Sequence, residues 1–82
     1  MPLSVFFTPR ARKDLHNLPQ TDRRQLLERI ESYAATRTGD VAALKDLPGS
    51  FRLRWGDWRV IFSVSGDVMT VKRVRHRREA YR

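Results

Sequence analysis

Apolar residues recur with two different periods along this 82-residue chain, and the change between them separates a helical part from a strand-forming part. A short apolar run at residues 3–7 predicts a first strand. Thr8-Pro9 then offers a helix N-cap followed by a proline at the first helical position. Up to residue 34, apolar side chains recur three or four positions apart, which is typical of amphipathic helices. Pro19 interrupts this stretch, so the pattern predicts two helices joined as a hairpin.

Apolar and polar residues alternate after Pro48-Gly49, and this period of two is typical of strands with one buried face. It predicts strands at 51–55, 58–64 and 68–74. Residues 36–40 are expected to form a loop, and residues 41–47 to contain a short turn. The sequence therefore predicts a single α+β domain over residues 1–82, in the order β-α-α-β-β-β. The N-terminal strand and the helical hairpin are expected to pack on one face of a mainly antiparallel four-stranded sheet.

The pair Gly56-Asp57 suits a two-residue hairpin loop, and such a loop fixes which residues of the two strands face each other. Trp55 is then expected opposite Trp58, and Arg54 opposite Arg59. One face of the predicted hairpin is wholly apolar and is expected to pack on the helices, with Met69 and Val71 of the last strand on the same side. The other face is predicted to carry Arg52, Arg54, Arg59 and Lys72.

Positive charge is concentrated in the second half of the chain. The net charge is +8, from 17 Lys and Arg against 9 Asp and Glu, and most of this excess lies after residue 41. Like charges facing each other across strands are destabilising, and a bound polyanion would relieve that repulsion. This favours binding of nucleic acid by the arginine-bearing face. A merely solvated polar face, which many antiparallel sheets have, is the alternative.

Several classes of protein do not fit this composition. Cysteine is absent, which leaves neither a disulfide framework nor a thiolate metal site. The sequence also has no Gly-rich phosphate loop and no His-Glu-x-x-His metal motif. We therefore expect no metal and no cofactor. Without a signal-like start or a long apolar stretch, the expectation is a cytoplasmic protein with no membrane contact.

The last eleven residues are rich in Lys and Arg and also contain His76, Glu79 and Tyr81. These three side chains can all transfer protons. The simpler interpretation of the segment is a solvated basic tail that contacts phosphates through charge alone.

Three stretches of the chain resemble the RelE branch of the RelE/ParE toxin superfamily. They are Ala43-Leu44-Lys45-Asp46-Leu47-Pro48-Gly49, Phe51-Arg52-Leu53-Arg54-Trp55-Gly56-Asp57-Trp58-Arg59-Val60-Ile61-Phe62 and Val74-Arg75-His76-Arg77-Arg78-Glu79-Ala80-Tyr81. The likeness extends over nearly the whole chain. It implies a RelE-like microbial RNase fold and the toxin of a type II toxin–antitoxin system. Such a toxin is a metal-independent endoribonuclease that enters the ribosomal A site, where it helps a ribose 2′-OH of the mRNA attack the adjacent phosphate.

The resemblance also implies partners and site residues. The partners are a small antitoxin with an acidic toxin-wrapping part, mRNA in the A site and rRNA, and the toxin–antitoxin hetero-oligomer would bind its own promoter DNA. The implied catalytic residues are Arg59, Arg77, Tyr81 and His76. The residues expected to bind RNA phosphates are Arg52, Arg54, Lys72 and Arg75. Because arginine does not lose its proton in proteins, proton transfer is expected from His76, Glu79 or Tyr81.

Two further hypotheses remain. The first is a ParE-like DNA gyrase inhibitor without nuclease activity. The second is a basic nucleic-acid-binding module with no activity of its own.

Overall fold

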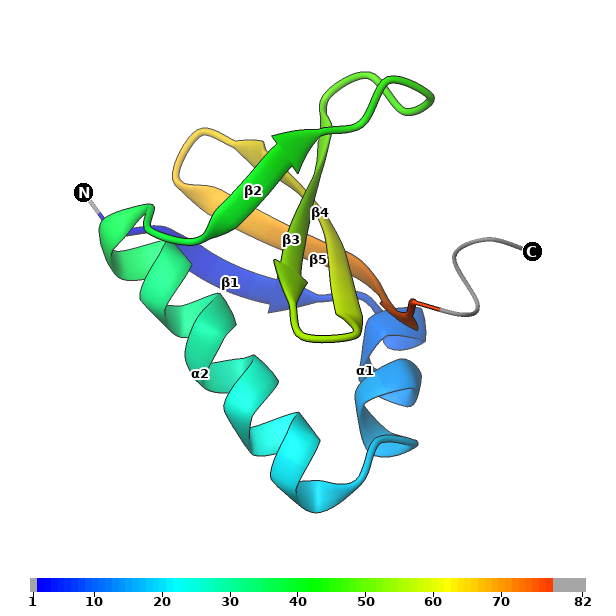
Figure 1. Ribbon diagram of the computed structural model, residues 1–82. Helices are drawn as coiled ribbons and strands as arrows, with labels where there is room; N and C mark the ends of the chain where they lie inside the picture. The colour runs from blue at the N-terminus through cyan, green and yellow to red at the C-terminus, as the bar shows by residue number, and fades with distance from the viewer. Residues whose placement is uncertain (1, 78–82) are drawn as a thin grey trace.

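The computed structural model describes residues 2–77, which form two helices and one five-stranded sheet (Figure 1). In chain order these elements are β1 (Ser4–Phe7), α1 (Pro9–His16), α2 (Gln20–Thr36), β2 (Asp40–Ala43), β3 (Ser50–Trp55), β4 (Trp58–Ser65) and β5 (Val68–His76). The strands lie in the order β1-β5-β4-β3-β2, with β1 parallel to β5 and all other pairs antiparallel. The predicted α+β class and mainly antiparallel sheet are confirmed.

Local sequence signals set the helix boundaries where they were expected. The Thr8 side chain accepts a hydrogen bond from the Ala11 N–H at 3.1 Å, and Pro9 occupies the first turn of α1. α2 follows directly on Pro19 and ends where Arg37 adopts a left-handed conformation, with φ of 62°. The two helices diverge from their connection and lie on one side of the sheet (Figure 1).

The expected strand count of four was too low, because Asp40–Ala43 forms the additional strand β2. This segment was assigned to a loop and a turn. It pairs antiparallel with β3, with Asp40 opposite Arg54 and Ala43 opposite Phe51. Three of its four residues are Asp or Ala, which are both depleted in strands. The strand therefore depends on hydrogen bonding to β3, a partner that the local pattern does not reveal.

The hairpin register is confirmed, with Trp55 opposite Trp58 and Arg54 opposite Arg59. β5 differs from a regular strand in one respect, a register shift of its pairing with β4 between Ile61 and Phe62. Ile61 faces Arg73, whereas Phe62 faces Val71, so that β5 contains one extra residue. Before this bulge the buried residues of β5 are Met69 and Val71, at odd-numbered positions. After it the buried residue is Val74, at an even-numbered position.

The hydrophobic core lies between the sheet and the two helices. Its largest fully buried side chains are contributed by α2 and the three central strands, and they include Leu26, Ile30, Val60, Phe62 and Met69. The rings of Tyr33 and Phe51 pack on Phe62, with centroids 5.2 and 5.6 Å away. This face of the sheet is called the inner face below, and the opposite face, which neither α1 nor α2 covers, is called the outer face. No helix within residues 2–77 has the length and apolar character needed to cross a membrane.

Candidate nucleic-acid interface

Two rows of residues cross the outer face at the hairpin end of the sheet. In the first row, Arg54, Arg59 and Arg75 are direct neighbours on β3, β4 and β5. In the second row, Arg52 and Arg73 flank Ile61 in the same order of strands. Directly opposed residues of antiparallel strands have Cα atoms about 4.5–5.5 Å apart. The register therefore gathers five guanidinium groups on one small area of sheet.

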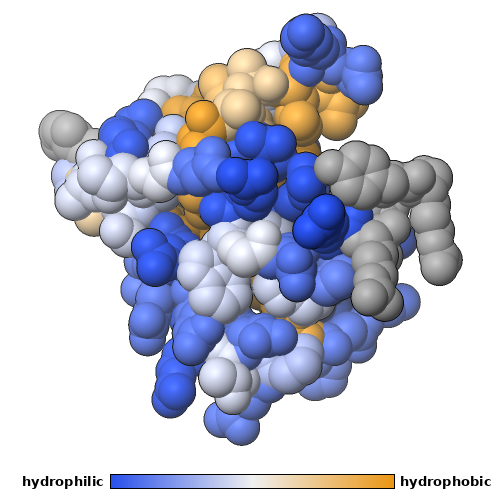
Figure 2. Space-filling model, viewed as in Figure 1, coloured by the Kyte–Doolittle hydropathy of each residue, from blue (hydrophilic) through white to orange (hydrophobic). Residues whose placement is uncertain are grey.

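Four of these arginines line one pocket of about 500 Å³, which we call the arginine pocket. Arg52, Arg59, Arg73 and Arg75, together with Ile61, come from the strands. The opposite wall is the loop between β2 and β3, and its lining residues are Leu44, Lys45, Asp46 and Leu47. In Figure 2 this loop, at the upper right, carries both apolar and strongly hydrophilic surface. The pocket thus combines cationic strands with a partly apolar loop.

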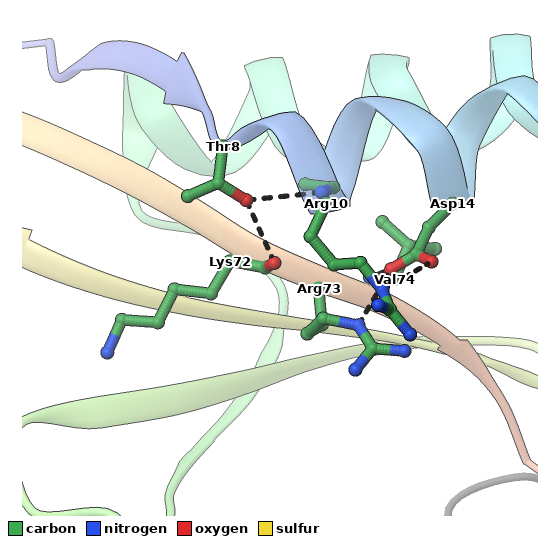
Figure 3. Close-up of polar contacts among 7 residues, drawn as sticks. Thr8, Arg10, Asp14, Lys72, Arg73 and Val74 are labelled. Carbon is green, nitrogen blue, oxygen red and sulfur yellow. Dashed lines mark hydrogen bonds and ion pairs between the residues drawn. The ribbon is translucent and has the colours of Figure 1, made fainter.

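Each row is flanked by one aspartate. On the β2 edge, the Nε and Nη2 atoms of Arg54 both lie 2.8 Å from Oδ2 of Asp40. Beyond β5, the Nε of Arg73 donates to Oδ2 of Asp14 at 3.0 Å, and Figure 3 shows this carboxylate on α1. Arg54 therefore belongs to the β2 edge and does not line the arginine pocket, whereas Arg73 is held at the rim of the pocket.

The arginine side chains are partly buried along their stems. The Nε atoms of Arg52, Arg59 and Arg75 are all inaccessible to solvent. Among the residues that the structure describes, the Nε of Arg52 has no hydrogen-bond acceptor. Leaving such a donor unsatisfied costs about 1–3 kcal/mol. A phosphate group bound in the pocket would supply both acceptors and negative charge, since guanidinium and phosphate form paired, charge-assisted hydrogen bonds.

Lys72 lies outside the arginine pocket, although it was expected to join the arginine face. Its Nζ donates to the Ser50 hydroxyl at 2.9 Å, and Ser50 is 2% exposed. Ser50 alternates with the inner-facing Phe51, so this contact places the Lys72 side chain on the outer face, near the start of β3 and outside the lining of the arginine pocket.

His76 lies on the inner face, and the structure does not bring it together with the arginines. It is the direct partner of Trp58 in the β4–β5 pairing, and Trp58 packs against the core. The two rings meet edge to face with centroids 4.9 Å apart. The register therefore places the His76 ring on the opposite face of the sheet from the strand residues that line the arginine pocket.

The remaining expected residues lie at or beyond the end of β5. Arg77 is exposed, and its N–H donates to the Asp57 carbonyl at 2.6 Å, which ties the end of β5 to the β3–β4 hairpin loop. Tyr81 and Glu79 lie outside the described residues.

Sequence reasoning missed Arg73 and the loop wall of the pocket. Regular alternation after Met69 and Val71 assigns Arg73 to the inner face, and only the bulge turns it outward. A charged residue at a predicted core position was the signal that could have revealed the bulge. The loop wall could not be recognised without the position of β2. In the described part of the chain, no group of three or more His, Cys, Asp or Glu side chains could hold a metal ion.

A family model described as the ParE toxin of the type II toxin–antitoxin system parDE matches residues 5–81. The chain belongs to this family, within the RelE/ParE superfamily of type II toxins. Toxin RelG of Mycobacterium tuberculosis is 32% identical to this toxin over 93 aligned positions, which cover the whole of this chain and 99% of the relative.

The fold is also similar to that of solved toxins described as RelE. The RelB–RelE antitoxin–toxin complex from Methanococcus jannaschii matches with a TM-score of 0.78 and 26% identity, covering 93% of this toxin and 94% of that chain. The RelBE2 complex from Mycobacterium tuberculosis matches with a TM-score of 0.78 and 28% identity, covering 94% of this toxin and 93% of that chain. A YoeB dimer from Staphylococcus aureus, at 22% identity and a TM-score of 0.65, shares the fold.

Proposed function

We propose that this toxin is a ribosome-dependent endoribonuclease that cleaves mRNA in the A site and thereby inhibits translation. The observation that carries the proposal is the arginine pocket, which Arg52, Arg59, Arg73 and Arg75 line together on the outer face of the sheet. A site of this kind suits a reaction in which negative charge builds up on a phosphate group. The similarity to Toxin RelG and to toxins solved as RelE–RelB complexes supports the same conclusion.

The reaction needs no group beyond the RNA and the protein's side chains. The ribose 2′-oxygen forms a bond to the adjacent phosphorus, and the bond from phosphorus to the 5′-oxygen of the next nucleotide breaks. The 2′-OH loses one proton and the leaving 5′-oxygen gains one, which yields a 2′,3′-cyclic phosphate and a 5′-OH. The phosphorane formed on the way carries one more negative charge than the diester, and the pocket guanidinium groups stabilise it.

We assign roles in this reaction from the positions of the described residues and, for Tyr81, from the family resemblance. Arg59 and Arg75 are adjacent in the first row, and we assign them to the scissile phosphate. Arg52 and Arg73 hold the neighbouring backbone. Arg77, at the end of β5, contributes a further charge, and Tyr81 is assigned to proton transfer and base stacking on the strength of the family resemblance. His76 receives no role in this scheme.

Biological control of the toxin would come from a cognate antitoxin. The relatives solved as RelB–RelE complexes are bound to an antitoxin, and an acidic antitoxin segment would be attracted to the same arginines. We propose that this hetero-oligomer forms in the cytoplasm and binds its own promoter DNA.

The test is a map of mRNA 5′ ends on translating ribosomes after addition of the purified toxin. Cuts in phase with codons are expected for the unmodified protein, and Arg59→Ala should reduce the rate at least about 100-fold, since loss of one charge-stabilising donor commonly costs that much. Arg12→Ala, a change at an exposed arginine on α1, is the matched control and should cut normally.

The family model itself describes a parDE toxin, which makes gyrase inhibition the competing function. Intact mRNA together with inhibited DNA supercoiling in a gyrase assay would overturn the proposal in favour of that activity. Intact mRNA together with unaffected gyrase activity would favour the remaining hypothesis, a basic nucleic-acid-binding module with no activity of its own.

A further inference from the structure

The arginine pocket has an apolar side that phosphate binding does not use. Leu47 is one of three large hydrophobic residues that are strongly exposed among the described residues, with 52% of its surface accessible. It lines the pocket together with Leu44, opposite the strand that carries Ile61. Ile61 lies between Arg52 and Arg73 in the second row, so an apolar residue occupies the centre of a cationic array.

The loop that presents Leu47 is fixed at both ends by backbone hydrogen bonds. The Leu44 N–H donates to the Ser50 carbonyl, and the Ser50 N–H donates to the Leu47 carbonyl, both at 3.0 Å. Ser50 is itself buried and accepts from Lys72 of β5, which anchors the end of the loop to the centre of the sheet. Leu47 is therefore held over the pocket by the sheet, and it is exposed without being part of a free chain segment.

We propose that the apolar lining of the pocket, Leu44 and Leu47 of the loop with Ile61 of β4, binds one nucleobase next to the phosphate held by the arginines, and we call this lining the Leu47 wall. This inference rests on the proposed function, because it takes the ligand of the pocket to be single-stranded RNA. A nucleotide presents a charged phosphate and a flat, largely apolar base face. The pocket likewise has both cationic and apolar lining residues, and its volume of about 500 Å³ exceeds what a phosphate group fills.

The chemistry of the wall also predicts how selective it is. Leucine and isoleucine side chains donate and accept no hydrogen bonds, so they bury a base face without reading its edge. The Leu47 wall should therefore favour bases with a large face, purines over pyrimidines, by a small factor. It should not discriminate adenine from guanine.

The experiment compares Leu47→Ser with Phe6→Ser, a change at a residue of β1 that is likewise 52% exposed but does not line the pocket. The probe is a short single-stranded RNA whose 2′-O-methyl groups prevent cleavage. A second oligonucleotide has the same backbone with abasic sites. Leu47→Ser should weaken binding of the first by about fivefold, which corresponds to loss of roughly 40 Å² of apolar contact. Binding of the abasic oligonucleotide should be unchanged, and Phe6→Ser should affect neither.

Equal weakening for both oligonucleotides, or for neither, would overturn the inference. A Leu47→Ser variant that binds RNA normally but loses its complex with the antitoxin would assign the wall to a protein partner and overturn it as well. Failure of the proposed function can be told apart from failure of this inference, because Arg59→Ala should weaken binding of both oligonucleotides. If the toxin binds this RNA through Leu47 but leaves mRNA intact, the proposed cleavage is refuted, while the proposal that the Leu47 wall binds a base still holds.

Discussion

Arg73 donates its Nε hydrogen to Oδ2 of Asp14 at 3.0 Å, and this contact joins the first helix to the arginine pocket. The same oxygen accepts the Val74 N–H at 3.0 Å (Figure 3). β1 pairs with β5 only as far as Val71, so the remaining edge of β5 needs other partners. Asp14 satisfies one backbone group of that edge and at the same time orients a guanidinium toward the pocket.

We expect Asp14→Asn to weaken RNA binding through Arg73 alone. The amide oxygen can still accept both hydrogen bonds but carries no charge, so it holds the Arg73 guanidinium less firmly. In a double-mutant cycle, the loss of affinity caused by Asp14→Asn should disappear in an Arg73→Met background. A loss of the same size in both backgrounds would show that Asp14 acts only on the fold. Arg10→Met is the control, because the Arg10 side chain is 62% exposed and its 3.9 Å contact with Asp14 is long, so it should contribute little.

Arg52→Met should stabilise the free toxin and weaken its binding to RNA. The change removes a buried Nε that has no acceptor among the described residues, and it removes one positive charge from the array. The free energy of unfolding should rise by about 1 kcal/mol in urea denaturation. Arg54→Met should bring no such gain, because Arg54 is paired with Asp40. A lower stability for Arg52→Met would contradict the inference that the unsatisfied Arg52 Nε and the repulsion between arginines destabilise the free toxin.

The register of the arginine face was predictable from the sequence because it depends on a local signal. Gly56-Asp57 specifies a two-residue loop, and the loop sets every cross-strand pair of the β3–β4 hairpin. The helix boundaries were predictable for the same reason, since Thr8 and Pro19 act on their immediate neighbours.

The features that complete the pocket depend on contacts between distant residues, and the sequence does not reveal them. β2 is stabilised by β3, across a loop of six residues, and its own composition does not favour a strand. The bulge that turns Arg73 outward reflects how β5 packs against β4 and α1 together. The same extra residue puts His76 on the inner face, where regular alternation from Met69 and Val71 would put it on the outer face.

Gly39→Ala should destabilise the toxin more than Gly66→Ala. Both glycines have positive φ, 150° and 61°, so each substitution strains the backbone. At Gly39 a Cβ atom would also lie 2.9 Å from Cδ1 of the buried Leu53, whereas nothing lies within 4 Å at Gly66. We expect a cost of about 1 kcal/mol at Gly66 and about 2–4 kcal/mol at Gly39, measured by thermal and urea unfolding. Equal costs would mean that Leu53 moves aside freely.

The salt dependence of RNA binding should report how many arginines contact phosphates. For single-stranded nucleic acid, the slope of log K against log salt concentration is about −0.7 for each phosphate neutralised. Arg59→Ala and Arg75→Ala should each reduce the magnitude of this slope by about 0.7, because both residues line the pocket. Lys72→Ala should leave the slope nearly unchanged, since the structure directs Lys72 to Ser50. A slope that falls as much for Lys72→Ala as for Arg59→Ala would mean that RNA contacts the whole outer face, including the part near Ser50, and is not confined to the arginine pocket.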